Sequence, residues 1–481
     1  MRENKKNILF ITCDQLRADY LGCYGNGIVK TPHIDALAQR GMLFDQMITA
    51  YPICAPNRAT LATGRYPSVH GLNRNGIILP KNEVTLMETL RQVGYVTAGV
   101  GKMHFGPQWA FPPEGGSEHD PMPALAINPQ PDALELPWYG FEEVWLTEDN
   151  RVGPYGDYLQ EHGYDVWADP HSFSYPQHQT VRSQYPVEHH QATWIADRSI
   201  DFLAKQTEQK PFFLWTSFVG PHHPFVVPAP YDTMYDPDDM PLPIFSEVEF
   251  EYWPDAYRSK QTKTEGSHEA IGMNRLSDDE WKRIRAFYCG MITQIDDQVG
   301  RIIEVLKIQG LYDNTLIVFT SDHGEMLGDH HLVFKGTTFD EVVRVPFILS
   351  HSSIPEASCE GLCSSTDVMP TLLDMADVDV PAGVQGVSLA PCIKKPSTPL
   401  RSEVLIETSQ LQRALRTETC FISWHGPGRQ GELYDLFSDP HQQDNLWGRP
   451  EFAELQDEMM GRLMESIVLN SDPLFERVGF C

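Results

Sequence analysis

The chain has 481 residues, more than one hydrophobic core ordinarily serves, so a large domain accompanied by a smaller one is expected. Its 37 Lys and Arg residues against 66 Asp and Glu residues give a net charge of −29, which argues against nucleic acid or an anionic membrane surface as a partner. No stretch is long and apolar enough to cross a bilayer, the N-terminus lacks the pattern of a signal peptide, and the nine cysteines are scattered. These observations predict a cytoplasmic protein with reduced cysteines.

Four short apolar segments predict strands that are buried on both faces, which is typical of a parallel sheet covered by helices. Each segment is followed at once by ionisable or metal-binding side chains. The segments are 7–13, before Asp14 and Gln15; 95–101, before Lys102 and His104; 212–220, before His222 and His223; and 315–321, before Asp322 and His323. Because ligands bind at the carboxyl ends of the strands in such sheets, we expect these side chains to meet at one edge.

Helical patterns lie between these strands, and the alternation indicates an α/β fold. Residues 85–94 and 277–310 each begin with a hydroxyl residue and have glutamate three positions later, which is the capping-box pattern. Residues 106–185 and 224–275 lack periodicity, as lids and substrate-binding loops often do. Aromatic side chains in these two segments could stack on a sugar, cage a cationic group or pack on one another: Trp109, Trp138, Tyr155, Tyr158, Tyr252 and Trp253.

A change of composition over residues 394–400 indicates a linker. Beyond it, segments 403–408, 420–425 and 432–437 predict strands, and residues 451–468 predict an amphipathic helix. We therefore predict two domains. Residues 1–393 hold a large mixed, mostly parallel sheet between helices, and residues 394–481 form a smaller α+β domain with an antiparallel sheet and a terminal helix.

Asp14 and Asp322 share a strand-end position, where two carboxylates either repel each other or share a cation. Oxygen ligands favour a hard cation such as calcium, magnesium or manganese, and the nitrogen of His323 shifts the preference toward manganese. Gln15 can add an amide oxygen. The alternative is that both aspartates only cap helices or turns.

Lys102, His104, His222 and Lys335 supply positive or titratable groups. If they cluster, they could hold a tetrahedral dianion such as sulfate, phosphate or phosphonate and protonate a leaving oxygen. Taken singly, each histidine could equally be a structural residue with satisfied hydrogen bonds.

Cys54 stands in the segment YPICAPNRATLATG, residues 51–64, and has no CxxC partner. The neighbouring Arg58 could lower the pKa of the thiol, which would suit a thiolate nucleophile. The alternative is a small buried residue that opens a helix.

Several motifs of the chain together resemble the sulfatase family of the alkaline phosphatase superfamily. The segment C-A-P-N-R-A-T-L-A-T-G, from Cys54 to Gly64, is similar to the signature in which the cysteine is oxidised to formylglycine. Further matches are Asp14 in the first strand, G-K-x-H at Gly101 to His104, P-H-x-P at Pro221 to Pro224, T-S-D-H-G-E at Thr320 to Glu325, Lys335 in F-K-G, and E-L-Y-D-L-x-x-D-P at Glu432 to Pro440. The resemblance covers nearly the whole chain and implies an alkaline-phosphatase-like fold.

The resemblance implies an enzyme that hydrolyses the sulfate ester of a small alcohol, phenol or sugar. Cys54 would be converted to formylglycine by a formylglycine-generating or anaerobic sulfatase-maturating enzyme, and its hydrated aldehyde would attack sulfur. One divalent cation, calcium first with manganese or magnesium as alternatives, would be held by Asp14, Gln15, Cys54, Asp322 and His323.

The remaining site residues receive roles from the same resemblance. Arg58 would hold the hydrate, and Lys102, His222 and Lys335 would grip the sulfate. Either His222 or Lys335 would protonate the leaving alcohol, and His104 would deprotonate the second hydroxyl so that sulfate is expelled.

Three positions depart from the commonest pattern of the family: Asn57 where serine is usual, Gln15 in place of a second aspartate, and His323 in place of an asparagine. Gln15 and His323, each beside an aspartate, also resemble the choline sulfatases and the phosphonate monoester hydrolases of the superfamily. A phosphonate monoester or phosphodiester hydrolase is therefore the alternative enzyme, and a non-catalytic anion-binding protein is the alternative if Cys54 stays unmodified. A chain of this size is often a homo-oligomer.

Overall fold

The computed structural model describes residues 5–106, 109–110, 122–123, 135–151, 153–171, 179–246, 249, 253–255, 257–258, 276–398, 400–408, 412–426 and 430–471. Within these residues no helix has the length and apolar character needed to cross a membrane. Trp109 lies in a short strand whose side chains are outside the description, and Tyr252 is outside it entirely.

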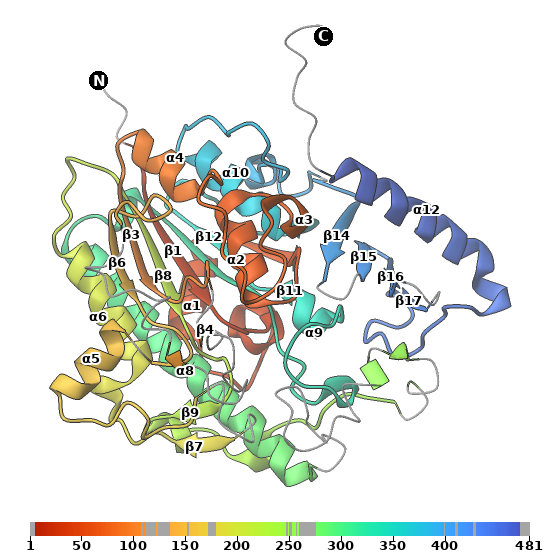
Figure 1. The fold of residues 1–481 in the computed structure, drawn as a ribbon, viewed down its shortest axis with the longest axis horizontal. Coiled ribbons are helices and arrows are strands. Elements are labelled where there is room, and N and C mark those ends of the chain that lie inside the picture. Colours follow the sequence, from red (N-terminus) through yellow and green to blue (C-terminus); the bar gives the residue numbers. More distant parts are fainter. Residues whose placement is uncertain are drawn as a thin grey trace, which may run out of the picture.

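A nine-stranded mixed sheet forms the centre of the molecule (Figure 1). In spatial order its strands are β11 (Arg344–Val345), β2 (Gly41–Ile48), β12 (Phe347–Ser350), β10 (Thr315–Ser321), β1 (Asn7–Cys13), β8 (Phe212–Phe218), β3 (Val96–Gly101) and β6 (Glu143–Leu146), with β13 (Ala357–Ser364) beside β2. The five strands from β10 to β6 are mutually parallel, while β11 and β12 run antiparallel to their neighbours. The four strands expected from the apolar segments are confirmed, and they are adjacent.

Helices cover both faces of this sheet because successive residues of each strand point to opposite sides. In β1, Leu9 and Ile11 join one core cluster while Ile8 and Phe10 join the other. The helices of the first face are α1 (Pro32–Gln39), α5 (Pro154–Glu161), α6 (Gln191–Leu203) and α8 (Asp278–Ile308). Those of the second face are α2 (Cys54–Thr63), α4 (Leu86–Gln92), α10 (Val368–Met375) and α11 (Ala390–Lys394), with α3 (Pro67–His70) against α2.

The two expected capping boxes have different outcomes. In α8, Ser277 accepts a hydrogen bond from the Glu280 N–H and the Glu280 side chain accepts from the Ser277 N–H, which completes the box. In α4, Thr85 accepts from the Glu88 N–H, but the Glu88 carboxylate turns to Arg91 instead. Both helix starts were therefore predicted correctly. In α4 the ion pair with Arg91 engages the Glu88 carboxylate, which would otherwise accept from the N-cap N–H.

The segment from 106 to 185 was expected to be irregular, and this expectation was wrong for its second half. It supplies the sheet strand β6 and helix α5, and a short strand β7 (Thr180–Arg182) that pairs with β9 (Phe225–Val227). Two more short strands, β4 (Trp109–Ala110) and β5 (Met122–Pro123), pair with each other. The described aromatic residues of these segments pack largely on other rings, Trp138 on Phe105 and Tyr155 on Trp194 among them.

A four-stranded antiparallel sheet and a long helix follow toward the C-terminus (Figure 1). The sheet consists of β14 (Glu403–Glu407), β15 (Arg413–Thr417), β16 (Cys420–Trp424) and β17 (Gly431–Asp435), and the helix is α12 (Ala453–Leu469). The sequence pattern missed β15, whose RALRT segment carries two arginines. One face of this sheet packs under α12 and the other packs on the short helix α9 (Asp340–Val343) and its neighbours, so the sheet is buried on both sides.

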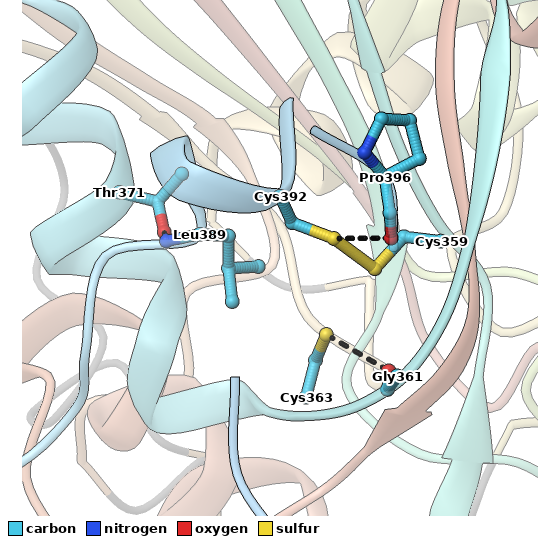
Figure 2. Close-up of a disulfide and its surroundings, with 7 residues drawn as sticks. All are labelled: Cys359, Gly361, Cys363, Thr371, Leu389, Cys392 and Pro396. Atoms are coloured by element: carbon cyan, nitrogen blue, oxygen red, sulfur yellow. Dashed lines mark hydrogen bonds between the residues drawn. A yellow bond between two sulfur atoms is a disulfide. The ribbon is translucent and has the colours of Figure 1, made fainter. Parts of the chain in front are cut away.

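Cys359 of β13 and Cys392 of α11 form a disulfide, shown in Figure 2. The expectation that all cysteines are reduced was therefore wrong for this pair. The two cysteines are 33 residues apart, and their spacing does not mark them as a pair in the sequence. The packing of α11 against the sheet brings their sulfurs together.

Candidate active site

The residues that follow the four central strands meet at one edge of the sheet, as expected. Asp14 follows β1 and Asp322 follows β10, the strand paired with it. Lys102 follows β3, and its backbone N–H donates to the Ser217 carbonyl of β8. The carboxyl ends of parallel strands thus bring together side chains that are far apart in the sequence.

Cys54 is the first residue of α2 and is buried beneath the other site residues, with 1% of its surface exposed. The Lys335 ammonium lies 3.5 Å from its sulfur, and so does the side-chain nitrogen of Asn75. Burial by itself would raise the pKa of the thiol, but Lys335 and then Lys102 lower it well below its usual value. The position is therefore built for an anionic or strongly polarised group.

Arg58 is fully buried and holds the two strand-end carboxylates. Its Nε donates to Asp322 at 2.7 Å, and its Nη2 lies 3.3 Å from Asp14. Its Nη1 donates to the Lys102 carbonyl and to the Ser217 hydroxyl. Among the described residues these contacts account for its hydrogen bonds, and none of them goes to Cys54, the partner that the sequence resemblance implies.

Within the described part of the chain, two buried atoms at the centre of the site accept or donate no hydrogen bond by geometry, namely Oδ1 of Asp14 and Nε2 of His323. They lie 3.6 Å apart, and together with the Cys54 sulfur they form a group whose ligand atoms are within 4.8 Å of one another. His323 donates from Nδ1 to the Gly324 carbonyl, so its Nε2 faces this group. Unsatisfied buried oxygen and nitrogen atoms are costly, and a divalent cation would satisfy both.

Gln15 adds an oxygen to this centre. Its backbone has a φ of +68°, and its side-chain nitrogen donates to Glu325 and to Nδ1 of His223. Its side-chain oxygen therefore faces the opposite way, where it accepts from Lys335 at 3.0 Å. These residues fit a cation site of oxygen and nitrogen donors.

Lys102 is fully buried between two carboxylates. Its Nζ lies 2.8 Å from Asp14 and 2.5 Å from Asp149, which follows the edge strand β6. Burial would lower the pKa of Lys102, but Asp14 and Asp149 raise it well above its usual value, so the residue stays charged. His104 lies two residues on with a φ of +54°, and its backbone N–H donates to Glu148.

His222 and His223 stack with ring centres 4.1 Å apart beside this group. Nδ1 of His222 donates to the His223 carbonyl at 2.5 Å, which leaves Nε2 as an acceptor in the neutral ring. Burial, assisted by Lys335, lowers the pKa of His222 to about 4. His222 is therefore neutral near pH 7 in the substrate-free site.

Comparison with known proteins agrees with these features. The sequence model of the Sulfatase family matches residues 6–378, and that of the C-terminal region of N-sulphoglucosamine sulphohydrolase matches residues 328–468. An arylsulfatase of Clostridium perfringens is 30% identical, with 96% of this chain and 94% of the relative covered. This chain belongs to the sulfatase family. It is thus a sulfuric ester hydrolase of the alkaline phosphatase superfamily.

Other relatives of this sulfatase carry different names. A multifunctional alkaline phosphatase superfamily protein, PehA of Trinickia caryophylli, is 33% identical over 94% of this chain and 93% of its own length. Among solved structures, a phosphonate monoester hydrolase of Agrobacterium radiobacter superimposes with a TM-score of 0.82 at 28% identity, covering 97% of this chain and 96% of the other. The alkaline-phosphatase-like fold expected from the sequence is confirmed.

Three residues of the site escaped the sequence reasoning: Asn75, Asp149 and Glu325. Asp149 follows a strand end as the expected residues do, but β6 lies in a segment interpreted as irregular. Glu325 stands inside the quoted T-S-D-H-G-E motif without an assigned role. Asn75 follows a turn and gave no signal of its own.

Asn57, which departs from the commonest family pattern, has a structural explanation here. Its Nδ2 donates to the Asp322 carbonyl at 2.6 Å, and its Oδ1 accepts from the Ser365 hydroxyl at 2.6 Å. The amide therefore bridges two neighbouring segments with both of its polar ends, so it secures α2 against the strand end that carries Asp322.

Proposed function

We propose that this sulfatase hydrolyses sulfate monoesters of a small alcohol, phenol or sugar with a nucleophile derived from Cys54. The observation that carries the proposal is the position of the Cys54 sulfur. It lies 3.5 Å from the Lys335 ammonium and within 4.8 Å of the partnerless atoms of Asp14 and His323. Positive side chains and a cation site thus surround the one residue that the family signature marks for oxidation.

Conversion of Cys54 to formylglycine would supply a hydrated aldehyde, which can form a sulfate ester and keep a second hydroxyl for expelling it. A divalent cation held by Asp14, Gln15, Asp322 and His323 would supply charge that stabilises the nucleophile and the ester oxygens. The oxygen-rich donor set favours calcium, with manganese or magnesium as alternatives.

Side chains of the protein would bind the sulfate and orient the proposed metal ligands. Lys102 and Lys335 would bind the sulfate oxygens, since both project toward Asp14 at the centre of the site. Arg58 would orient Asp14 and Asp322, because its Nε and Nη2 contact both carboxylates. The resemblance further implies that Arg58 holds the hydrated aldehyde derived from Cys54.

We assign protonation of the leaving oxygen to Lys335. In the neutral ring of His222, Nδ1 is committed to the His223 carbonyl and Nε2 carries a lone pair, so this ring has no proton to give in the substrate-free site. Lys335 carries N–H donors beside Cys54. His104 would then act as the base that removes a proton from the second hydroxyl.

The first test is the mass of the peptide that contains Cys54, from protein made in a host with a formylglycine-generating enzyme. We expect an aldehyde in place of the thiol, and we expect the Cys54→Ser variant to have no multiple turnover, since its sulfate ester could not be expelled. An unmodified thiol in fully active protein would contradict the proposal.

A phosphonate monoester hydrolase remains the second candidate, because Gln15 and His323 replace the commoner ligands and the superimposed solved structures include enzymes of that name. Turnover of 4-nitrophenyl sulfate and of a matched 4-nitrophenyl phosphonate monoester separates the two. We expect the larger kcat/KM for sulfate; a large preference for phosphonate would overturn the leading proposal.

A further inference from the structure

A pocket lies beside the proposed sulfate site and shares residues with it. Its wall includes Asp149 and His222, which border the catalytic group, and extends from there to Arg151, His190 and Gln294. The pocket is partly open to solvent. It lies among the segment after β6 and helices α5, α6 and α8, which Figure 1 shows together on one side of the sheet. A leaving group attached to the sulfate would extend from His222 into this space.

Arg151 is the unusual feature of the pocket, because it is a buried cation that forms no ion pair with a carboxylate of the described residues. Only 8% of its surface is exposed. Its Nη1 donates to the Asp169 carbonyl at 2.8 Å and its Nη2 to the Pro170 carbonyl. No carboxylate of the described residues lies within ion-pair distance of its guanidinium. Buried charges are otherwise nearly always paired, because desolvation of an unpaired charge is costly.

The other charged side chains of the pocket wall do not pair with Arg151, whose guanidinium lies over the Tyr185 ring at 5.8 Å from its centre. Asp149 is the one acidic side chain in the described wall, and its carboxylate is engaged by Lys102 at 2.5 Å. His190 also lines the wall, where burial and then Arg151 lower its pKa to about 3, so it is neutral. The pocket therefore presents a net positive guanidinium whose carbonyl contacts use two of its five N–H donors.

The backbone conformation of Arg151 is uncommon for a residue other than glycine. Arg151 has a φ of +52°, a conformation that costs a non-glycine residue free energy and that persists where the surrounding structure requires it. The two carbonyl contacts hold the guanidinium at the pocket wall and do not use its other N–H donors.

We propose that this pocket binds the alcohol part of the substrate and that Arg151 recognises a carboxylate on it. The inference rests on the proposed sulfate ester hydrolysis and names its substrate class: sulfate monoesters of hydroxy acids. A planar carboxylate matches the guanidinium fork with two charge-assisted hydrogen bonds and neutralises the buried charge.

The test compares esters that differ in that charge alone. The ortho, meta and para carboxyphenyl sulfates are each paired with the corresponding carbamoylphenyl sulfate, and the ratio of kcat/KM within each pair is measured for wild type and variants. We expect R151Q to lower this ratio about tenfold or more for at least one isomer. R151K, which keeps the charge but not the fork, should give an intermediate ratio.

Arg198→Gln is the matched control, because it removes one positive charge from α6 outside the pocket, where Arg198 pairs with Asp201. It should leave every ratio unchanged. Because the same pair of esters is used for wild type and each variant, differences in the intrinsic reactivity of the esters do not affect the comparison of their ratios. Equal ratios in wild type and R151Q for all three isomers would overturn the inference. If R151Q does not fold, the same kcat/KM ratio is measured for R151K, and a ratio equal to that of wild type would overturn the inference.

A protein that does not hydrolyse sulfate esters would be distinguished from one that lacks the carboxylate pocket. If no sulfate ester is turned over, binding of the three hydroxybenzoates and the three hydroxybenzamides is measured by calorimetry. Tighter binding of a hydroxybenzoate that R151Q abolishes would still support the carboxylate pocket. Equal binding of acids and amides would contradict it.

Discussion

Gln15 shows how one hydrogen-bond network can orient a proposed metal ligand. An amide offers either its oxygen or its nitrogen, and only the oxygen binds a cation. Glu325 accepts from the Gln15 nitrogen through Oε2, while its Oε1 accepts from the backbone N–H groups of Leu327 and Phe334. The Glu325 carboxylate thereby forces the Gln15 oxygen toward Lys335 and the centre of the site.

We expect Glu325→Gln to weaken the affinity for a divalent cation by about 10- to 100-fold. The new amide must keep its oxygen on the two backbone donors, so its NH2 would face the NH2 of Gln15 and turn that side chain over. Calorimetric titration of calcium or manganese into metal-stripped protein measures the change. Glu304→Gln, on the exposed surface of α8, is the control. Unchanged affinity in E325Q would show that Gln15 is not a ligand.

At the scale of elements, the disulfide joins the edge of the central sheet to α11. Cys359 pairs within the β13 register on β2, and Cys392 lies in a five-residue helix that is short for a stable element by itself. Figure 2 shows Cys363, a buried free thiol on the same strand, close to the bridge. The bridge therefore fixes a short helix that carries little local stability.

Cys392→Ser should lower the free energy of unfolding by about 3 to 4 kcal/mol, the loop-closure contribution for a separation of 33 residues. Cys363→Ser makes the same chemical change at another buried position without removing a bridge. Its loss of unfolding free energy measures the cost of burying a hydroxyl and is subtracted from that of Cys392→Ser. Urea unfolding without reductant measures both variants. Alkylation of Cys359 and Cys392 in native protein prepared without reductant would show that the bridge does not form.

At the scale of the whole molecule, several histidines are buried in their neutral form. Burial is the leading cause that lowers the pKa of each from 6.5: to about 3 for His70 and His190, and to about 4 for His222 and His351. Several buried acids oppose them: burial raises the pKa of Asp296 to about 7 and also raises the pKa values of Glu325, Glu341 and Asp367, among others.

These shifts predict that acid destabilises the protein. Between about pH 6.5 and pH 4 the unfolded chain binds protons at histidines that the folded chain keeps neutral, so stability falls as the pH falls. The lowered pKa values of His171 and His223 add to this effect, whereas the raised pKa values of His330 and of buried acids such as Asp296 reduce it. We expect Tm to decrease by roughly 5 °C between pH 7.5 and pH 5. Calorimetric scans over this range, with a smaller decrease in His190→Gln, check the prediction; a flat profile would contradict it.

The sequence by itself determined the central strands, the helix starts and the family. Apolar segments such as 7–13 and 315–321 predicted the central strands, because a strand buried on both faces must be apolar throughout. The residues that follow them, Asp14 and Asp322 among them, then had to lie at one sheet edge. The match of the segment from Cys54 to Gly64 with the sulfatase signature supplied the family.

Only the tertiary structure decided the pairings across the sequence. Lys102 meets Asp149 because β6 joins the edge of the sheet, and Cys359 meets Cys392 because α11 packs beside β13. The unpaired charge of Arg151 could not be recognised in the sequence either, since an arginine is unpaired only with respect to its neighbours in space. Patterns of a few residues determine local structure, whereas contacts between distant segments depend on how the elements pack as a whole.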